Sequence, residues 1–313
     1  MAHLLADLAV QRLGRRRIED EAEWGGLAGG AWHDWYSPEC PNWLFCLYLI
    51  AIMVRPAIAP ESLFMSTQTI ARGQSNENTA DSFGVTPVNK VKRVHERGRY
   101  DRKTVYEILD AALVCHIAYV IDGRPYCTPT SFWREGDHLY WHGSSASRMI
   151  RTQGQGVPVC LTVTHLDALV MARSGFHHSV NYRAVMAFGT AHIIDDVEKK
   201  LTLMDRFIDR IYPGRSKLIR QPNKQEFKAT TMMGMEIEHA SGKIRDKHVA
   251  DEEEDYAGVP AWSSLYPVTQ VIGAPSECER QLPGLERPDD MTDFEPGARL
   301  DELMTKSYRR TFG

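Results

Sequence analysis

Short runs rich in β-branched and aromatic residues, several of them alternating with polar residues, fill the middle of the chain and predict β-strands. The runs are residues 114–121, 124–133, 138–142, 157–164, 168–173, 183–194 and 231–238. Asp122-Gly123, between the first two runs, is a dipeptide typical of tight turns, so we predict a β-hairpin there. The whole set of short strands predicts a closed or nearly closed antiparallel barrel rather than a parallel sheet.

Two other segments repeat their apolar residues at helical spacing. Asp101 can cap a helix whose apolar residues between Val105 and Ala112 fall on one face. Apolar residues recur at the same spacing from Val197 to Ile211, with charged residues on the other side, and Pro213-Gly214 ends that run. We predict one helix that leads into the first strand and a second that packs on the barrel.

The two ends of the chain show neither the alternation of a strand nor the apolar spacing of a helix. Residues 1–88 mix Gly-rich, Trp-rich and Ser/Asn-rich pieces, which predicts a poorly ordered N-terminal extension. Residues 276–313 are rich in Pro, Gly and acidic residues, so we expect a loose C-terminal tail with at most a short helix from Arg299 to Tyr308. The barrel domain is therefore assigned to residues 89–275.

The extension leaves two interpretations open. Met53 and Met65 allow a later translation start, in which case the residues before them are not part of the mature protein, and the rival interpretation is a targeting or partner-binding segment. The apolar run from Trp43 to Val54 is shorter than the ~20 residues that cross a bilayer. We therefore expect no membrane contact.

Composition narrows the function classes. An apolar fraction of 43% is ordinary for a globular core, and 37 basic against 41 acidic residues give a net charge of −4, so nucleic acid is not expected as a partner. The six cysteines form no C-x-x-C pair, which argues against a zinc site or a redox dithiol and favours free thiols in the cytoplasm. Neither G-x-G-x-x-G after a strand nor a phosphate-binding G-x-x-x-x-G-K is present.

One candidate site is the segment Trp141–Arg148, where a predicted strand ends in three serines, a glycine and an arginine before a predicted helix. Unpaired N–H groups at a helix start attract phosphate, and hydroxyl and guanidinium groups add directed hydrogen bonds. An ordinary Ser-rich turn capped by Ser147 explains the same residues, so both interpretations stay open here.

A second polar cluster, Phe176–Arg183, lies directly before an apolar strand, a place where side chains often face a ligand or an interface. His177 and His178 are adjacent, and neighbours on an extended chain point to opposite faces. They cannot easily share one ion, so no metal site is predicted.

These segments carry a family resemblance. The hairpin is followed, in order, by W-H-G-S-S-A-S-R, V-P-V-C-L-T-V-T and H-H-S-V-N-Y-R. Together they resemble the flavin-nucleotide-binding branch of the pyridoxamine 5′-phosphate oxidase-like split barrels, which includes nitroimidazole-resistance proteins, over about Val94 to Pro275. The resemblance implies a mainly β (α+β), six-stranded antiparallel split barrel with flanking helices, a homodimer, and FMN in the groove between subunits.

The resemblance also implies site residues. Ser147 and Arg148 would hold the phosphate, with His142 and Ser144 as second contacts, and Met149 stands where the family often has lysine. The residues implied to contact the flavin ring edge are Thr128 and Thr130, and those implied to line the same groove are Ser179, Asn181, Tyr182 and Arg183. No residue is singled out as a general acid or base.

The function implied is an FMN-binding oxidoreductase that acts on an unknown small molecule. Three alternatives stay open: a flavin-binding protein without catalysis, a haem-binding barrel, and a barrel that has lost its cofactor and only dimerises. For the haem alternative, the candidate axial ligands are His177, His178 and His192.

Overall fold

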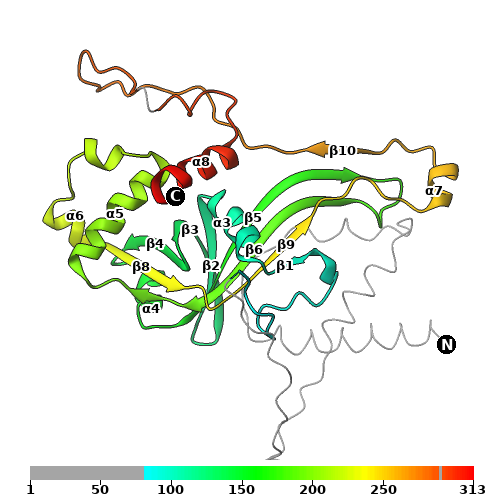
Figure 1. The fold of residues 1–313 in the computed structure, drawn as a ribbon, viewed down its shortest axis with the longest axis horizontal. Coiled ribbons are helices and arrows are strands. Elements are labelled where there is room, and N and C mark those ends of the chain that lie inside the picture. The colour runs from blue at the N-terminus through cyan, green and yellow to red at the C-terminus, as the bar shows by residue number, and fades with distance from the viewer. Residues whose placement is uncertain (1–80, 289–290) are drawn as a thin grey trace, which may run out of the picture. The chain divides into compact units, whose positions relative to one another are not determined.

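The computed structural model describes residues 81–288 and 291–313 (Figure 1). Most of the predicted N-terminal extension, including the apolar run at 43–54, lies outside the described residues. Within the described residues, no helix combines the length and the apolar character that a membrane crossing requires.

Ten described strands form one antiparallel sheet, in the order β1-β9-β6-β5-β2-β3-β4-β8-β7, with β10 paired to β5. The strands are β1 (Gly98–Arg99), β2 (Val114–Ile121), β3 (Arg124–Glu135), β4 (His138–Ser144), β5 (Pro158–Met171), β6 (Ser179–Thr190), β7 (His192–Ile193), β8 (Thr230–Glu236), β9 (His239–Arg245) and β10 (Ser264–Pro267). The predicted fold class, an antiparallel β-structure with flanking helices, is confirmed.

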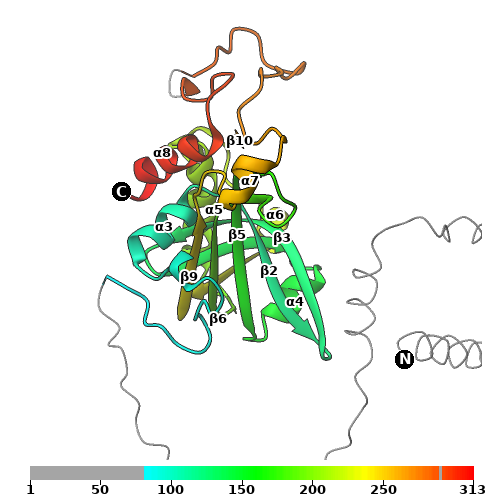
Figure 2. The same cartoon turned by 90° about the vertical axis from the view of Figure 1, so that its right-hand side faces the viewer.

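Helices flank this sheet. They are η1 (His95–Arg97), α3 (Arg102–Asp110), α4 (Arg148–Gln153), α5 (Val197–Ile211), η2 (Arg215–Leu218), α6 (Lys224–Ala229), α7 (Glu253–Gly258) and α8 (Leu300–Phe312). Figure 2 shows α5 and α8 toward one end of the sheet and α4 toward the other. Both predicted helices form, and the carboxylates of Asp101 and Asp196 cap α3 and α5.

The predicted hairpin forms as well. Asp122 and Gly123 have φ values of 49° and 75°, the positive values that the favoured two-residue hairpin turns require. Ile121 pairs with Arg124 directly across this turn. The turn chemistry of two residues therefore fixes the register of β2 against β3.

Several strand predictions differ from the structure. Residues 157–164 and 168–173 form one long strand, β5, because Asp167 is accommodated as a bulge between Leu166 and Ala168 rather than as a turn. Strand β6 begins at Ser179 instead of residue 183. Strand β9, which follows β8, was not predicted, because its sequence H-A-S-G-K-I-R does not alternate.

The core lies on the inner face of the sheet. Alternate residues of β2, Cys115, Ile117 and Tyr119, are buried there. Trp141 is fully buried, and its indole N–H donates a 3.0 Å hydrogen bond to the side chain of Gln153 in α4. This bond satisfies the polar atom of the largest core side chain and ties α4 to β4.

A smaller cluster lies on the opposite face of β3, β4 and β8, under α5. It contains Trp133, Tyr140, Leu203 and Met232, with Phe207 packed against them. Since residues alternate between faces along a strand, Tyr140 and His142 of β4 point toward α5 while Trp141 points into the main core. The ring of His142 therefore lies under α5, beside Phe207.

The C-terminal segment differs from the loose tail that was predicted. Leu303 and Met304 of α8 are 6% and 1% exposed, and α8 packs on α5. The buried guanidinium of Arg210 donates to the backbone carbonyl of Met304 at 2.9 Å. The short helix allowed at Arg299–Tyr308 does form, as Leu300–Phe312, but it packs on the domain instead of lying in a loose tail. At the other end, Phe83, inside the predicted extension, is 2% exposed and belongs to the core.

Candidate functional site

The loop after β4 brings several predicted site residues together. Ser144 pairs with Thr230 of β8, and the N–H of Ser145 donates to the carbonyl of Ala229 at 2.9 Å, so the loop is held against β8. Ser147 occupies the N-cap position of α4, but its hydroxyl makes no capping hydrogen bond. The hydroxyl therefore remains available for an acceptor or donor from outside the chain.

Glycine is required at the start of this loop. A Cβ atom at Gly143 would lie 2.9 Å from Cγ1 of Ile150, a buried residue of α4. Because that distance is shorter than a normal contact, only glycine allows α4 to pack so closely on β4. The close packing keeps Ser144 and Ser147 near the helix start.

Arg148 links the loop to β3. Its guanidinium carbon lies 4.4 Å from the ring centroid of Tyr126, a cation–π contact that orients an otherwise exposed side chain. Tyr126, Thr128 and Thr130 are alternate residues of β3, and the hydroxyl of Thr128 shares a 3.1 Å hydrogen bond with Tyr119. The loop and one end of this β3 face are thus neighbours.

Met149 stands where the family's phosphate loop often has lysine, and its surroundings show why lysine would not fit. Its side chain is 7% exposed and belongs to the main core. A lysine in that orientation would bury its charge, which is costly without a partner. The basic character of this loop therefore depends on Arg148 and Arg151, and Arg151 already donates to the carbonyl of Ala146 at 2.6 Å.

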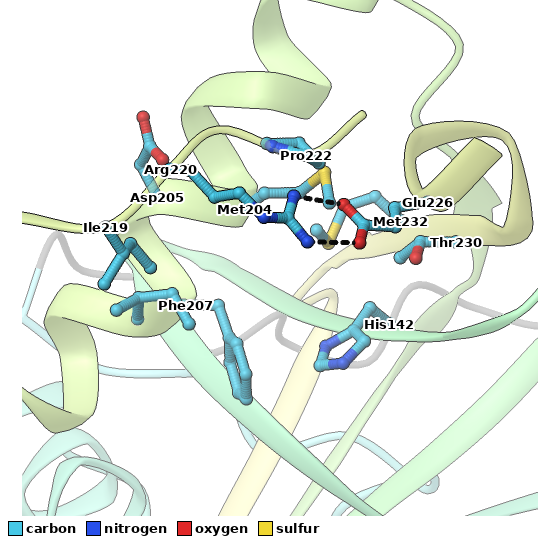
Figure 3. Close-up of a pocket in the computed structure, with 11 residues that line it drawn as sticks. His142, Met204, Asp205, Phe207, Ile219, Arg220, Pro222, Glu226, Thr230 and Met232 are labelled. Atoms are coloured by element: carbon cyan, nitrogen blue, oxygen red, sulfur yellow. Dashed lines mark hydrogen bonds and ion pairs between the residues drawn. The ribbon is translucent and has the colours of Figure 1, made fainter. Parts of the chain in front are cut away.

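A cavity of about 460 Å³ lies beside the loop, between β4, β8, α5 and α6. Its lining residues are His142, Met204, Asp205, Phe207, Ile208, Ile219, Arg220, Pro222, Glu226, Thr230 and Met232. Figure 3 shows the rings of His142 and Phe207 on one side of the cavity and the Arg220–Glu226 ion pair, at 2.6 Å, across from them. The lining is mainly apolar, with a single imidazole.

The His142 ring has unusual surroundings. Its centroid lies 4.5 Å from that of Phe207 in an edge-to-face arrangement, and its Nδ1 is buried without a hydrogen-bond partner among the described residues. Burial lowers the pKa of His142, because a charged imidazolium would lose its hydration there. The ring is therefore neutral at neutral pH, with a lone pair on one nitrogen.

The second predicted cluster lies at the other end of the sheet, at the start of β6. Asn181 is 3% exposed; its side-chain amide donates to the carbonyl of Lys247 at 3.0 Å, and its oxygen accepts from Arg245. Asn181 thus joins β6 to the segment after β9. Ser179 is exposed and Tyr182 half-buried.

Arg183 is engaged within the chain. Its guanidinium lies 2.8 Å from the carboxylate of Asp167, in the β5 bulge, and 3.2 Å from that of Asp301 in α8. Hydrogen bonds to Asp167 raise the pKa of Arg183. Two carboxylates therefore compensate the charge of Arg183, which was implied to line the flavin groove.

The three histidines predicted as haem ligands have other surroundings. His177 lies 3.3 Å from the carboxylate of Glu252, and Nδ1 of His178 lies 2.8 Å from the carbonyl of Ser174. His192 is exposed on β7. Within the described part of the chain, no group of three or more His, Cys, Asp or Glu side chains is placed to hold a metal ion.

Sequence reasoning missed the cavity and Tyr126. The apolar spacing of α5 predicted that Met204 would be buried. Met232, however, lies beside His142 only because β8 pairs with β4, and Phe207 contacts His142 because α5 packs over these strands. Nothing in the local sequence predicts that pairing. Tyr126 lay in a predicted strand, and its contact with Arg148 depends on how the loop folds back.

Comparisons with known proteins agree with this fold. The family described as Pyridoxamine 5′-phosphate oxidase matches residues 101–244. The flavocytochrome Anf3 from Azotobacter vinelandii is 39% identical over 68% of this chain and 98% of its own, with a TM-score of 0.63. The FAD and haem binding protein from Mycobacterium smegmatis is 32% identical over 65% of this chain and 98% of its own, with a TM-score of 0.61.

No curated protein sequence matches the chain. The resemblance that the motifs predicted is nevertheless confirmed, because two solved structures above 30% identity are matched over nearly their whole length. This chain belongs to the pyridoxamine 5′-phosphate oxidase family.

Proposed function

We propose that this protein is an oxidoreductase that binds both a flavin and a haem. The observation that carries the proposal is the 39% identity to a flavocytochrome over 98% of that protein's length. The FAD and haem binding protein, at 32% identity over 98% of its length, supports the same pair of cofactors. Flavin and haem would supply the electron transfer, a chemistry that side chains alone lack.

The loop after β4 is the proposed flavin phosphate site. Ser144, Ser147 and Arg148 lie on one short segment there, and the Ser147 hydroxyl has no partner in α4. Hydroxyl and guanidinium groups are the donors that phosphate oxygens accept from. Because α4 has only six residues, we assign the binding to these side chains rather than to the helix dipole.

The identity of the flavin has two candidates. FMN is the flavin implied by the sequence motifs, whereas the similar mycobacterial protein is named for FAD. The phosphate contacts described above serve either one, since both carry a phosphate next to the ribityl chain. Chromatography of the released flavin distinguishes them.

We also propose that the protein is a homodimer. Val114 and Val120 of β2 and Met186 of β6 are 51%, 57% and 45% exposed. His116 pairs with Thr162 and Thr162 with Met186, so these strands present one continuous outer face. A second copy on this face would bury these apolar side chains.

An absorbance spectrum of the purified full chain tests the proposed cofactors. We expect flavin bands together with a Soret band, and reduction of the bound flavin when a reduced nicotinamide is added. A protein that stays colourless after incubation with flavin and hemin would contradict the proposal. Flavin bands that no reduced donor bleaches would instead favour a flavin-binding protein without catalysis.

A further inference from the structure

The cavity beside His142 has the properties of a site for a large, mainly apolar ligand. Its volume of about 460 Å³ lies within the usual range for small-molecule sites, about 300–1,000 Å³. Met204, Phe207 and Met232 supply much of the wall around the imidazole. Apolar and aromatic walls with a few placed polar groups are typical of cofactor sites.

The neutral ring of His142 is the feature that the fold does not explain. A buried imidazole nitrogen normally has a hydrogen-bond partner, because leaving a buried polar atom unsatisfied destabilises the fold. Among the residues that the structure describes, His142 Nδ1 has none. Histidine binds iron through its neutral imidazole, and the neutral imidazole of His142 lies beside an apolar cavity.

We propose that haem binds in this cavity with His142 as an axial ligand of the iron. This inference rests on the proposed function, which includes haem. The side chains of Met204 and Met232 line the same cavity and would contact the porphyrin. Arg220 lines the cavity too. Its guanidinium, which forms an ion pair with Glu226 in the structure, is suited to bind a haem propionate instead.

The other histidines fit less well. His177 is paired with Glu252, and His178 is bonded to the Ser174 carbonyl, in a segment before β6 that lies outside this cavity. His192 is exposed and is not a lining residue. The structure thus favours His142 over the three histidines selected from the sequence.

A role as haem ligand differs from the role that was first expected for His142. The family resemblance implied that it is a second contact for the flavin phosphate. On β4, however, its ring points under α5 and contacts Phe207, at 4.5 Å between centroids. The two roles are separable, because removal of a phosphate contact weakens flavin binding and removal of an axial ligand weakens haem binding.

The test compares wild type, His142→Ala and His138→Ala as full chains, each incubated with hemin and flavin. His138 is exposed, lies on the same strand and does not line the cavity, which makes it a matched control. We expect wild type and the control to show equal Soret bands per chain. His142→Ala should lose most of the Soret absorbance, keep its flavin content and regain the Soret band when imidazole is added.

A second variant covers the case in which the alanine variant does not fold. His142→Met keeps a side chain that can bind iron, so we expect it to retain haem with a shifted Soret maximum and a raised haem reduction potential. An unchanged Soret band in either variant would overturn the assignment of His142 while leaving haem binding intact. Loss of flavin with retention of haem would assign His142 to the phosphate instead. A wild-type chain that takes up flavin but no hemin would overturn the haem half of the proposed function itself.

Discussion

Arg148 and Arg183 carry the same charge in different surroundings, and the difference decides which of them can bind an anion. Arg183 lies between Asp167 and Asp301, at 2.8 and 3.2 Å. Arg148 contacts the ring of Tyr126 and has no carboxylate partner among the described residues. An incoming phosphate would therefore meet an uncompensated charge at Arg148.

Arg148→Ala is accordingly expected to weaken flavin binding. Loss of a hydrogen bond to a charged group costs about 1.5–3 kcal/mol, or roughly 10- to 100-fold in the dissociation constant. Fluorescence titration of the flavin-free protein measures it. Arg309→Ala, which removes an exposed arginine from α8, should leave the dissociation constant unchanged. Equal affinity for both variants would contradict the assignment of this loop.

At the residue scale, the sequence grouped candidate site residues only where they are close along the chain. Ser144, Ser147 and Arg148 were identified together because they share one loop, and the structure keeps them together. The cavity around His142 could not be predicted, because its lining residues are spread along the sequence from His142 to Met232. Their contact follows from strand pairing, which a local pattern does not specify.

Among the elements, α8 was expected only as a short helix in a loose tail, and its observed packing on the domain can be tested. Met304 is 1% exposed, so Met304→Ala should lower the free energy of unfolding by about 2–5 kcal/mol. Urea denaturation measures this value. Lys306→Ala, which removes an exposed side chain of the same helix, should cost no more than about 1 kcal/mol. Similar small effects for both would indicate that α8 does not pack on the domain in solution.

The first turn of α8 should also make stability depend on pH. Hydrogen bonds from Arg299, and then from Arg183, lower the pKa of Asp301 to about 2. Because the folded pKa lies below the unfolded one, this stabilisation is complete above the unfolded value of about 4 and disappears as the pH falls toward 2.

We therefore expect Asp301→Asn to be less stable than wild type at pH 6 and to approach it between about pH 4 and about pH 2. Urea unfolding of both proteins across this range measures the difference, and Glu286→Gln, an exposed change outside α8, serves as the control. A stability difference that stays constant down to pH 2 would show that the carboxylate charge is not the cause.

The elements also show where sequence patterns are reliable. Alternation and the Asp122-Gly123 turn predicted β2 and β3 well, because both are local. The division of β5 was wrong, because Asp167 resembles a turn residue in the sequence but forms a bulge whose carboxylate binds Arg183. The partner that makes this bulge favourable lies sixteen residues away.

For the whole molecule, the outer face of β2, β5 and β6 is the surface that a second copy would cover. Met186, which is 45% exposed, lies on this face, so Met186→Arg would place a charge in the contact. Light scattering should give twice the chain mass of 35.5 kDa for wild type and the single chain mass for the variant. Glu198→Arg, at an exposed site on α5, should remain dimeric. A monomeric wild type would contradict the proposed dimer.

The contact between Arg210 and α8 has a consequence for biosynthesis. Arg210 donates to the carbonyls of Asp110 and Ala112 at the end of α3 and to that of Met304 in α8, so one guanidinium joins early, middle and last parts of the domain. Because the thirteen-residue helix α8 is synthesised after α3 and α5, this contact forms only once residues 300–312 have left the ribosome. A premature stop codon shortly before residue 300 would therefore leave the surface under α8 uncovered.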